Sequence, residues 1–287
     1  MTALSPFATP GDALRHHAAQ RPAAPALAFP ESGQRLSFAE WLAEAEALAR
    51  GLLDLGLLPG DHLALLAENR LEWPVSQMAA ALGGFVLVPL NSHYRRDDLG
   101  YALTQSDSKA VLLSRAFRSN PYLENLRSLR VDLPLLRHVV LFDGTEPDCV
   151  AYGALLSAGR RSKAALPAVN GTAPAALLYT SGTTGFPKGA LLTHLGMLGN
   201  SWGTAQRFAV GPNDRWTSII PPFHCAGCIM IALGCLQAGA CQVGIPAFDP
   251  VAMFRVIGSE RCRVRLLARL LPPLDLGTIC SISKGTP

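Results

Sequence analysis

The sequence predicts an α/β protein made of layered αβ subdomains with mainly parallel sheets. Helical and strand-like hydrophobic patterns alternate through the first half of the chain, which is typical of parallel strands joined by helices. The chain has 287 residues, of which 49% are hydrophobic and 16% are charged. That length and composition suffice for two subdomains, each with its own core, and exclude a disordered chain.

The first predicted helix begins after Ser37, because Ser37 and Glu40 have the spacing of a capping box. Apolar residues continue on one helical face as far as Leu52, and Gly56 ends the helix. A strand is expected next, at residues 62–67.

The alternation then repeats along the chain. The expected elements are a helix at residues 73–82 closed by Gly83 and Gly84, a strand at 85–88, a helix opening near Asp97, and strands at 109–113 and 138–142.

Residues 161–174, rich in alanine and proline, are interpreted as a linker between two subdomains. We therefore expect an N-terminal α/β subdomain at residues 1–160 and a second α/β subdomain at 175–287. In the second, an apolar strand at 175–179 leads into a glycine-rich loop, and Thr193 is expected to cap a helix that runs towards Phe208. The loop is thus expected between a strand and a helix.

Charge and cysteine content narrow the class of function. The formal charge is +4, and the arginines are scattered apart from residues 261–269, so nucleic acid is excluded as a partner. Seven cysteines, without a secretory signal, favour free thiols in a reducing compartment. The N-terminus lacks an apolar signal core, so a cytoplasmic location is expected.

Residues 217–248 contain no charged side chain apart from His224, which raises the alternative of a transmembrane segment. Prolines, glycines and glutamines interrupt this stretch, and its best helical run, 226–238, is too short to cross a bilayer. We expect a buried core helix there and no transmembrane segment.

The glycine-rich loop, Thr180 to Gly189 (TSGTTGFPKG), has the composition of an oxyanion site. It holds three glycines, four hydroxyl-bearing residues and one lysine. Glycines let backbone N–H groups converge on phosphate oxygens, and Lys188 adds a compact positive charge. It is not a Walker loop, because Pro187 stands where glycine would precede the lysine. The alternative is an ordinary solvated turn.

The longer string TSGTTGFPKGALLTH resembles the phosphate-loop signature of the adenylate-forming superfamily, which includes acyl-CoA synthetases, luciferases and peptide-synthetase adenylation domains. Segments LSFAEW, LGLLPGD, AENRLEW and GGFVLVPLNSHYRRDDLGYAL extend the resemblance over about residues 22–113. It implies that the loop grips the β- and γ-phosphates of ATP, with Thr183 or Thr184 near Mg²⁺ and Lys188 in a catalytic role. The implied nucleotide-binding residues are Thr180, Ser181, Gly182, Thr183, Thr184, Gly185, Phe186, Pro187 and Lys188.

A second segment, Pro222 to Gly227 (PFHCAG), resembles the family motif at the acyl-adenylate and thioester end of the site. The resemblance makes His224 a candidate catalytic residue. The alternative is a histidine of the core whose hydrogen bonds are satisfied and which has no catalytic role.

Two other patterns admit different chemistry. Cys225-x-x-Cys228 next to His224 is compatible with a metal or redox site, although buried cysteine also behaves as a small hydrophobe. His93 and Asp98 have an acyltransferase spacing, but Asp98 equally suits the start of a helix, where it stabilises the positive end of the dipole.

The resemblance weakens after about Arg261. The final residues, LDLGTICSISKGTP, resemble a later adenine-binding segment, which would place Gly285 and Pro287 near adenine. Family motifs for metal, ribose and the adenylation lysine do not follow. The chain is therefore expected to be an incomplete large domain of the adenylate-forming fold, truncated and defective as a complete ligase.

By resemblance, the function is that of an AMP-forming acid–CoA ligase. A carboxylic acid, expected to be a fatty acid, would react with ATP to give an acyl-adenylate, and CoA would then displace AMP. The alternative is a non-catalytic nucleotide- or acyl-binding protein that pairs with a full-length relative or a complementary chain.

Overall fold

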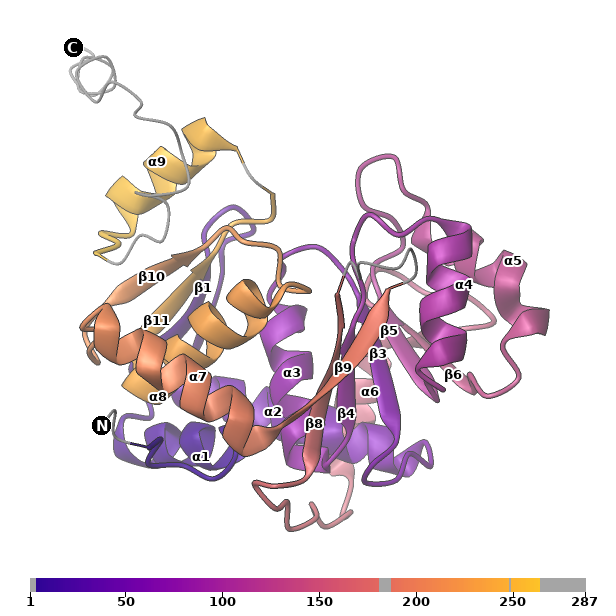
Figure 1. Cartoon of the computed structure of the whole chain (residues 1–287), viewed down its shortest axis with the longest axis horizontal. Helices are drawn as coiled ribbons and strands as arrows, with labels where there is room; N and C mark the ends of the chain where they lie inside the picture. Colours follow the sequence, from indigo (N-terminus) through magenta and orange to yellow (C-terminus); the bar gives the residue numbers. More distant parts are fainter. Residues whose placement is uncertain (1–3, 181–186, 248, 264–287) are drawn as a thin grey trace.

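The computed structural model describes residues 4–180, 187–247 and 249–263 (Figure 1). One sheet is built from β3 (His62–Leu66), β4 (Val86–Pro89), β5 (Ala110–Leu113), β6 (His138–Leu141), β7 (Val150–Ala151), β8 (Pro174–Thr180) and β9 (Lys188–Thr193). In the described part of the chain its order is β7-β6-β5-β3-β4-β8-β9. All neighbours are parallel except β8 and β9, which are antiparallel.

The second sheet is built from β1 (Pro25–Phe29), β2 (Gln34–Ser37), β10 (Arg215–Ser218) and β11 (Cys241–Gly244). Its order over the described residues is β10-β11-β1-β2, and only the β1–β2 pair is antiparallel. The mainly parallel α/β class predicted from the sequence is therefore confirmed.

Helices cover both faces of the larger sheet. The helices of the first half are α1 (Pro10–Gln20), α2 (Phe38–Asp54), α3 (Glu72–Gly83), α4 (Arg96–Gln105), α5 (Tyr122–Leu129), a short 3₁₀ turn (Arg130–Asp132) and α6 (Tyr152–Arg161). Leu63 and Leu65 of β3 share a core with α2 and α3, whereas Ala64 and Leu66 share a core with α4 and α5. This alternation is expected of a strand buried on both faces.

The later helices are α7 (His194–Arg207), the π-helical segment η2 (Ala226–Leu233), α8 (Gly234–Ala238) and α9 (Pro250–Ser259). The core that contains α2 and α3 also includes β1 and η2, so α2 and α3 lie between the two sheets (Figure 1). The segment 226–238 is the buried helix predicted from the sequence, although its first part is π-helical. Among the described residues, no helix is long and apolar enough to cross a membrane.

Capping residues in the sequence predicted the ends of these helices correctly. The Ser37 N–H donates to Glu40 Oε2 at 2.8 Å and the Glu40 N–H donates to Ser37 Oγ at 3.3 Å, which is the predicted capping box. Gly84 ends α3 in the left-handed region, with φ of 71°. Thr193 caps α7 by accepting from the Gly196 N–H at 3.2 Å.

Two expectations differ from the structure. The glycine-rich loop leaves β8 and returns in β9, so it connects two antiparallel strands, and the expectation of a strand followed directly by a helix was wrong. β9 escaped recognition because it is an edge strand with little burial and no clear alternation. In addition, each sheet takes strands from both sides of residues 161–174, so the two sheets do not divide at the expected linker.

Candidate functional site

A cavity of about 650 Å³ lies beside the β8–β9 hairpin. Its walls come from the end of β4 and the segment that follows it, the end of β8, the strand β9 with the residue before it, and the segment between β10 and η2. The lining residues are Pro89, Asn91, Tyr94, Leu178, Tyr179, Thr180, Pro187, Ala190, Leu192, Phe223, His224 and Cys225. The fold therefore brings the loop segment and the PFHCAG segment, which are about forty positions apart in the sequence, to one cavity.

The ends of the glycine-rich loop lie at the wall of this cavity. Thr180 and Lys188 are opposite each other in the β8–β9 ladder, and the Thr180 hydroxyl lies 3.4 Å from the Lys188 carbonyl oxygen, to which it donates. Both residues are exposed, and Thr180 and Pro187 line the cavity. The other predicted loop residues lie outside the described part of the chain: Ser181, Gly182, Thr183, Thr184, Gly185 and Phe186.

Helix α4 holds both strands of the hairpin through two tyrosine hydroxyls. The Tyr179 hydroxyl donates to the carbonyl of Ala102 at 2.8 Å, and it lies 2.6 Å from Gln105 Oε1. The Tyr101 hydroxyl donates to the Pro187 carbonyl at 3.0 Å. Burial raises the pKa of Tyr179 to about 12, so its hydroxyl keeps its proton at neutral pH. These anchors fix where the loop begins and ends.

Sequence reasoning missed these two tyrosines. Tyr101 falls in the GYAL part of a segment that was used only for the family resemblance, and Tyr179 was assigned only to an apolar strand. The available signal was a polar hydroxyl within an otherwise apolar strand next to a proposed site.

His224 lies in a tight turn just before η2 and is exposed to the cavity. Its Nδ1 accepts from the Ala226 N–H at 3.2 Å, so the neutral ring carries its proton on Nε2. The turn closes with the Gly227 N–H donating to the His224 carbonyl at 2.8 Å. A Cβ at position 227 would stand 2.5 Å from the Pro221 carbonyl oxygen, so only glycine fits there. The PFHCAG turn thus presents the imidazole with a defined tautomer.

The two cysteines of Cys225-x-x-Cys228 face different surroundings. Cys225 lines the cavity, with Sγ 3.7 Å from His224 Nδ1. Cys228 is buried, and burial raises the pKa of its thiol to about 12. Within the described ranges, no three His, Cys, Asp or Glu side chains are grouped so as to hold a metal ion.

Asp98 acts at the start of α4, as the helix interpretation predicted. Its Oδ2 accepts from the Arg95 N–H at 3.3 Å in the first turn. The nearby His93 ring lies 3.2 Å from Asn91 Oδ1. These contacts give the His93–Asp98 spacing a structural explanation.

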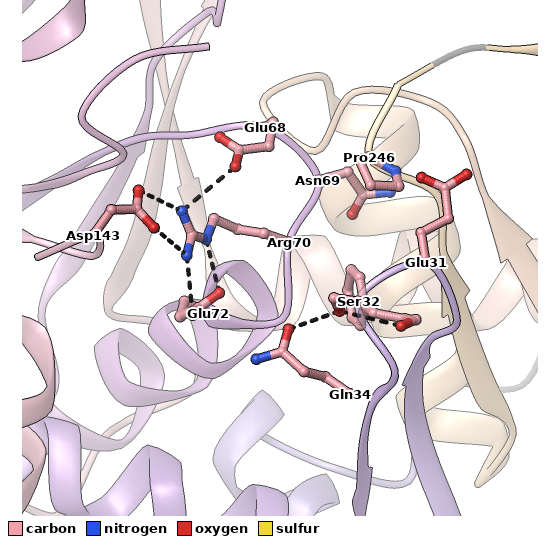
Figure 2. Close-up of a pocket in the computed structure, with 10 residues that line it drawn as sticks. Glu31, Ser32, Gln34, Glu68, Asn69, Arg70, Glu72, Asp143 and Pro246 are labelled. Atoms are coloured by element: carbon pink, nitrogen blue, oxygen red, sulfur yellow. Dashed lines mark hydrogen bonds and ion pairs between the residues drawn. The ribbon is translucent and has the colours of Figure 1, made fainter.

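A separate cavity of about 230 Å³ is formed near the carboxyl ends of β1, β3, β6 and β11 (Figure 2). Its centre is Arg70, whose guanidinium donates in bidentate fashion to Glu72 and to Asp143 and reaches Glu68 at 3.4 Å. Figure 2 shows these carboxylates converging on the same guanidinium. Because these carboxylates already occupy the guanidinium donors of Arg70, we interpret this cluster as a structural tie between loops and place the functional site at the larger cavity.

Comparisons with known proteins find relatives along most of the chain. YngI of Bacillus subtilis (strain 168), which is named as an acyl-CoA synthetase, is 30% identical over 315 aligned residues that cover 97% of this chain and 56% of YngI. The mitochondrial medium-chain acyl-CoA ligase ACSF2 of Homo sapiens is 28% identical, with 88% of this chain and 45% of that protein covered. The chain thus spans about half the length of the curated relatives it matches.

Solved structures show the same fold. The inhibitor-bound N-terminal domain of FACL13 from Mycobacterium tuberculosis superposes with a TM-score of 0.76 at 28% identity, covering 88% of this chain and 61% of that chain. ATP-bound MatB from Rhodopseudomonas palustris gives a TM-score of 0.73 at 26% identity, covering 88% and 48%. The family model described as AMP-binding enzyme matches residues 14–268. The chain therefore belongs to the AMP-binding enzyme family.

Proposed function

We propose that this chain binds ATP through residues Thr180–Lys188 and carries the front part of an AMP-forming acid–CoA ligase site. The observation that supports this most is the 650 Å³ cavity that joins the ends of the loop to His224. A nucleotide at the loop and an acid near His224 would then be adjacent.

The chemistry of the loop suits a triphosphate. Backbone N–H groups at Gly182 and Gly185 can approach phosphate oxygens closely, and Lys188 supplies a positive charge. Hydroxyl oxygens at Thr183 and Thr184 are ligands of the kind that Mg²⁺ accepts, and the hydroxyl-bearing residue Thr180 in the cavity wall adds to this oxygen-rich set. When bound with ATP, Mg²⁺ would neutralise phosphate charge.

The proposed reaction has two steps. The substrate carboxylate attacks the α-phosphorus of ATP, the bond to the bridging oxygen breaks, and pyrophosphate leaves with that electron pair. The thiolate of CoA then attacks the acyl carbon of the adenylate, and AMP leaves. We assign His224 to the acyl end of the cavity, where the proton on Nε2 can be donated to an oxygen of the acid.

A fatty acid is the substrate class we favour. The cavity wall is largely apolar, with contributions from Leu178, Leu192 and Phe223. An apolar wall stabilises an alkyl chain by removing it from water. The names of relatives such as the medium-chain ligase ACSF2 point to the same class.

The proposal is tested by pyrophosphate release from ATP–Mg²⁺ with a panel of fatty and aromatic acids. The chain is assayed alone and with the C-terminal half of a relative added in trans. We expect turnover in the complemented mixture, with His224→Ala reducing it about a hundredfold, the scale of losing one preorganised donor. Absence of turnover in both assays would refute the proposed ligase activity. The alternative function would then be that of a nucleotide- or acyl-binding protein that pairs with another chain.

A further inference from the structure

A third, much smaller cavity is lined by residues of α1, α3, α7, η2 and the strands β4 and β8. Its volume is about 10 Å³, at the lower limit of the space that holds a single water molecule. Its lining residues are Pro10, Gln77, Ala81, Leu87, Pro89, Ala175, Ala176, His194, Met197 and Cys228. Only Gln77 and His194 among them contribute strongly polar side chains.

Both of these polar side chains carry unsatisfied atoms. His194 is 1% exposed, and over the described residues neither of its ring nitrogens has a hydrogen-bond partner. Gln77 is 7% exposed; its Nε2 donates to the Cys228 carbonyl at 2.9 Å, while its Oε1 has no partner in the same part of the chain. Leaving such groups unpaired costs about 1–3 kcal/mol each.

We propose that one buried water molecule occupies this cavity and bridges His194 to Gln77. A neutral imidazole has one donor and one acceptor nitrogen, and the amide oxygen is an acceptor. Water can donate one O–H to Gln77 Oε1 and hydrogen-bond a ring nitrogen of His194 in either tautomer. The remaining wall is apolar, so water is the ligand that fits the volume and pairs Gln77 Oε1 with one of the two ring nitrogens of His194.

The bridge would connect the two parts of the functional site. His194 follows β9 directly, and β9 carries the returning end of the glycine-rich loop. Gln77 holds the carbonyl of Cys228, which lies in the first turn of η2 just after His224. A single water molecule therefore ties the loop-bearing hairpin to the helix that follows the histidine, whichever ligand fills the larger cavity.

A high-resolution crystal structure of the whole chain is the direct test. We expect one ordered solvent peak within hydrogen-bond distance of both Gln77 Oε1 and a ring nitrogen of His194. A cavity without solvent density would overturn the proposal.

A double-mutant cycle in urea unfolding gives a second, independent test. Gln77→Met and His194→Leu should each lower stability, and the loss in the double variant should be smaller than the sum, because neither partner remains unsatisfied. Gln237→Met is the matched control: this buried amide already donates to the Leu198 carbonyl and lies 2.6 Å from Ser201 Oγ, so its loss should add to that of His194→Leu. Additive losses for Gln77 and His194 would contradict the bridge.

Discussion

At the scale of single residues, Arg70 shows how one side chain can organise several loops. It is 17% exposed and holds three carboxylates from the turn after β3, the start of α3 and the segment after β6. Burial alone would raise the pKa of Asp143, but the hydrogen bonds and charge of Arg70 outweigh this and hold that pKa below its usual value. Arg70 therefore contributes to stability only while these carboxylates are ionised.

We predict that Arg70→Met destabilises the fold by roughly 3 kcal/mol at pH 7, because it leaves half-buried carboxylates without a counter-ion. The folded-state pKa of Asp143 is depressed, so its contribution is present above its unfolded pKa and is lost as the pH falls through the lower folded value. The deficit of the variant should thus shrink below about pH 4. Urea unfolding across pH measures this.

Arg96→Met provides the control, since Arg96 pairs with the neighbouring Asp97 on the exposed surface. We expect a change near zero for it. Equal losses in the two variants would show that the Arg70 cluster is no stronger than a surface pair.

Two buried histidines make stability sensitive to mild acid. Burial lowers the pKa of His194, and it also lowers that of His17, with some opposition from the Gln237 carbonyl. Below about pH 6.5, the pKa of histidine in the unfolded chain, the unfolded state binds protons that the folded state does not bind. Stability therefore falls as the pH drops towards the folded-state pKa values. Unfolding at pH 7.5 and 5.5 should show this loss, and the His17→Gln, His194→Gln double variant should show less of it. An unchanged pH dependence in that variant would count against the assignment.

At the scale of elements, the β8–β9 hairpin depends on α4. Removing the hydroxyls with Tyr101→Phe and Tyr179→Phe should cost about 1 kcal/mol for each hydrogen bond lost. We expect faster amide hydrogen exchange in β8 and β9, with little change in β5 or β6. Tyr152→Phe on α6, whose ring packs against Phe142, is the control and should leave exchange in the hairpin unaltered. Uniformly faster exchange across the sheet would argue against a specific anchor.

Sequence patterns predicted the elements best where the signal is local. The Ser37–Glu40 capping box, Gly84 and the Thr193 cap each depend on a few neighbouring residues, and each was placed correctly. The pairing of β1 with β11 joins Leu27 to Gln242, and no local pattern encodes such a contact. For the same reason, only the family resemblance connected Thr180 with His224, and the contribution of Tyr101 was not foreseen.

At the scale of the whole molecule, the chain crosses between the two sheets more than once. β1 and β2 come from the first segment but pair through β11 with the last described strands, while β8 pairs with β4. Residues 1–160 alone would lack β8, β10 and β11. We therefore predict that this fragment does not unfold cooperatively in urea, whereas the whole chain does. A cooperative transition in the fragment would mean that the first segment forms an independent domain.

Calorimetric titration with ATP–Mg²⁺ shows whether the loop at Thr180–Lys188 binds the phosphates of ATP. Losing one charged hydrogen-bonding group costs about 1.5–3 kcal/mol, so Lys188→Ala should weaken binding by roughly tenfold or more. Lys163→Ala, an exposed lysine in the segment before β8, should bind like the unaltered chain. Equal affinity in all three proteins, or no binding in any of them, would contradict the claim.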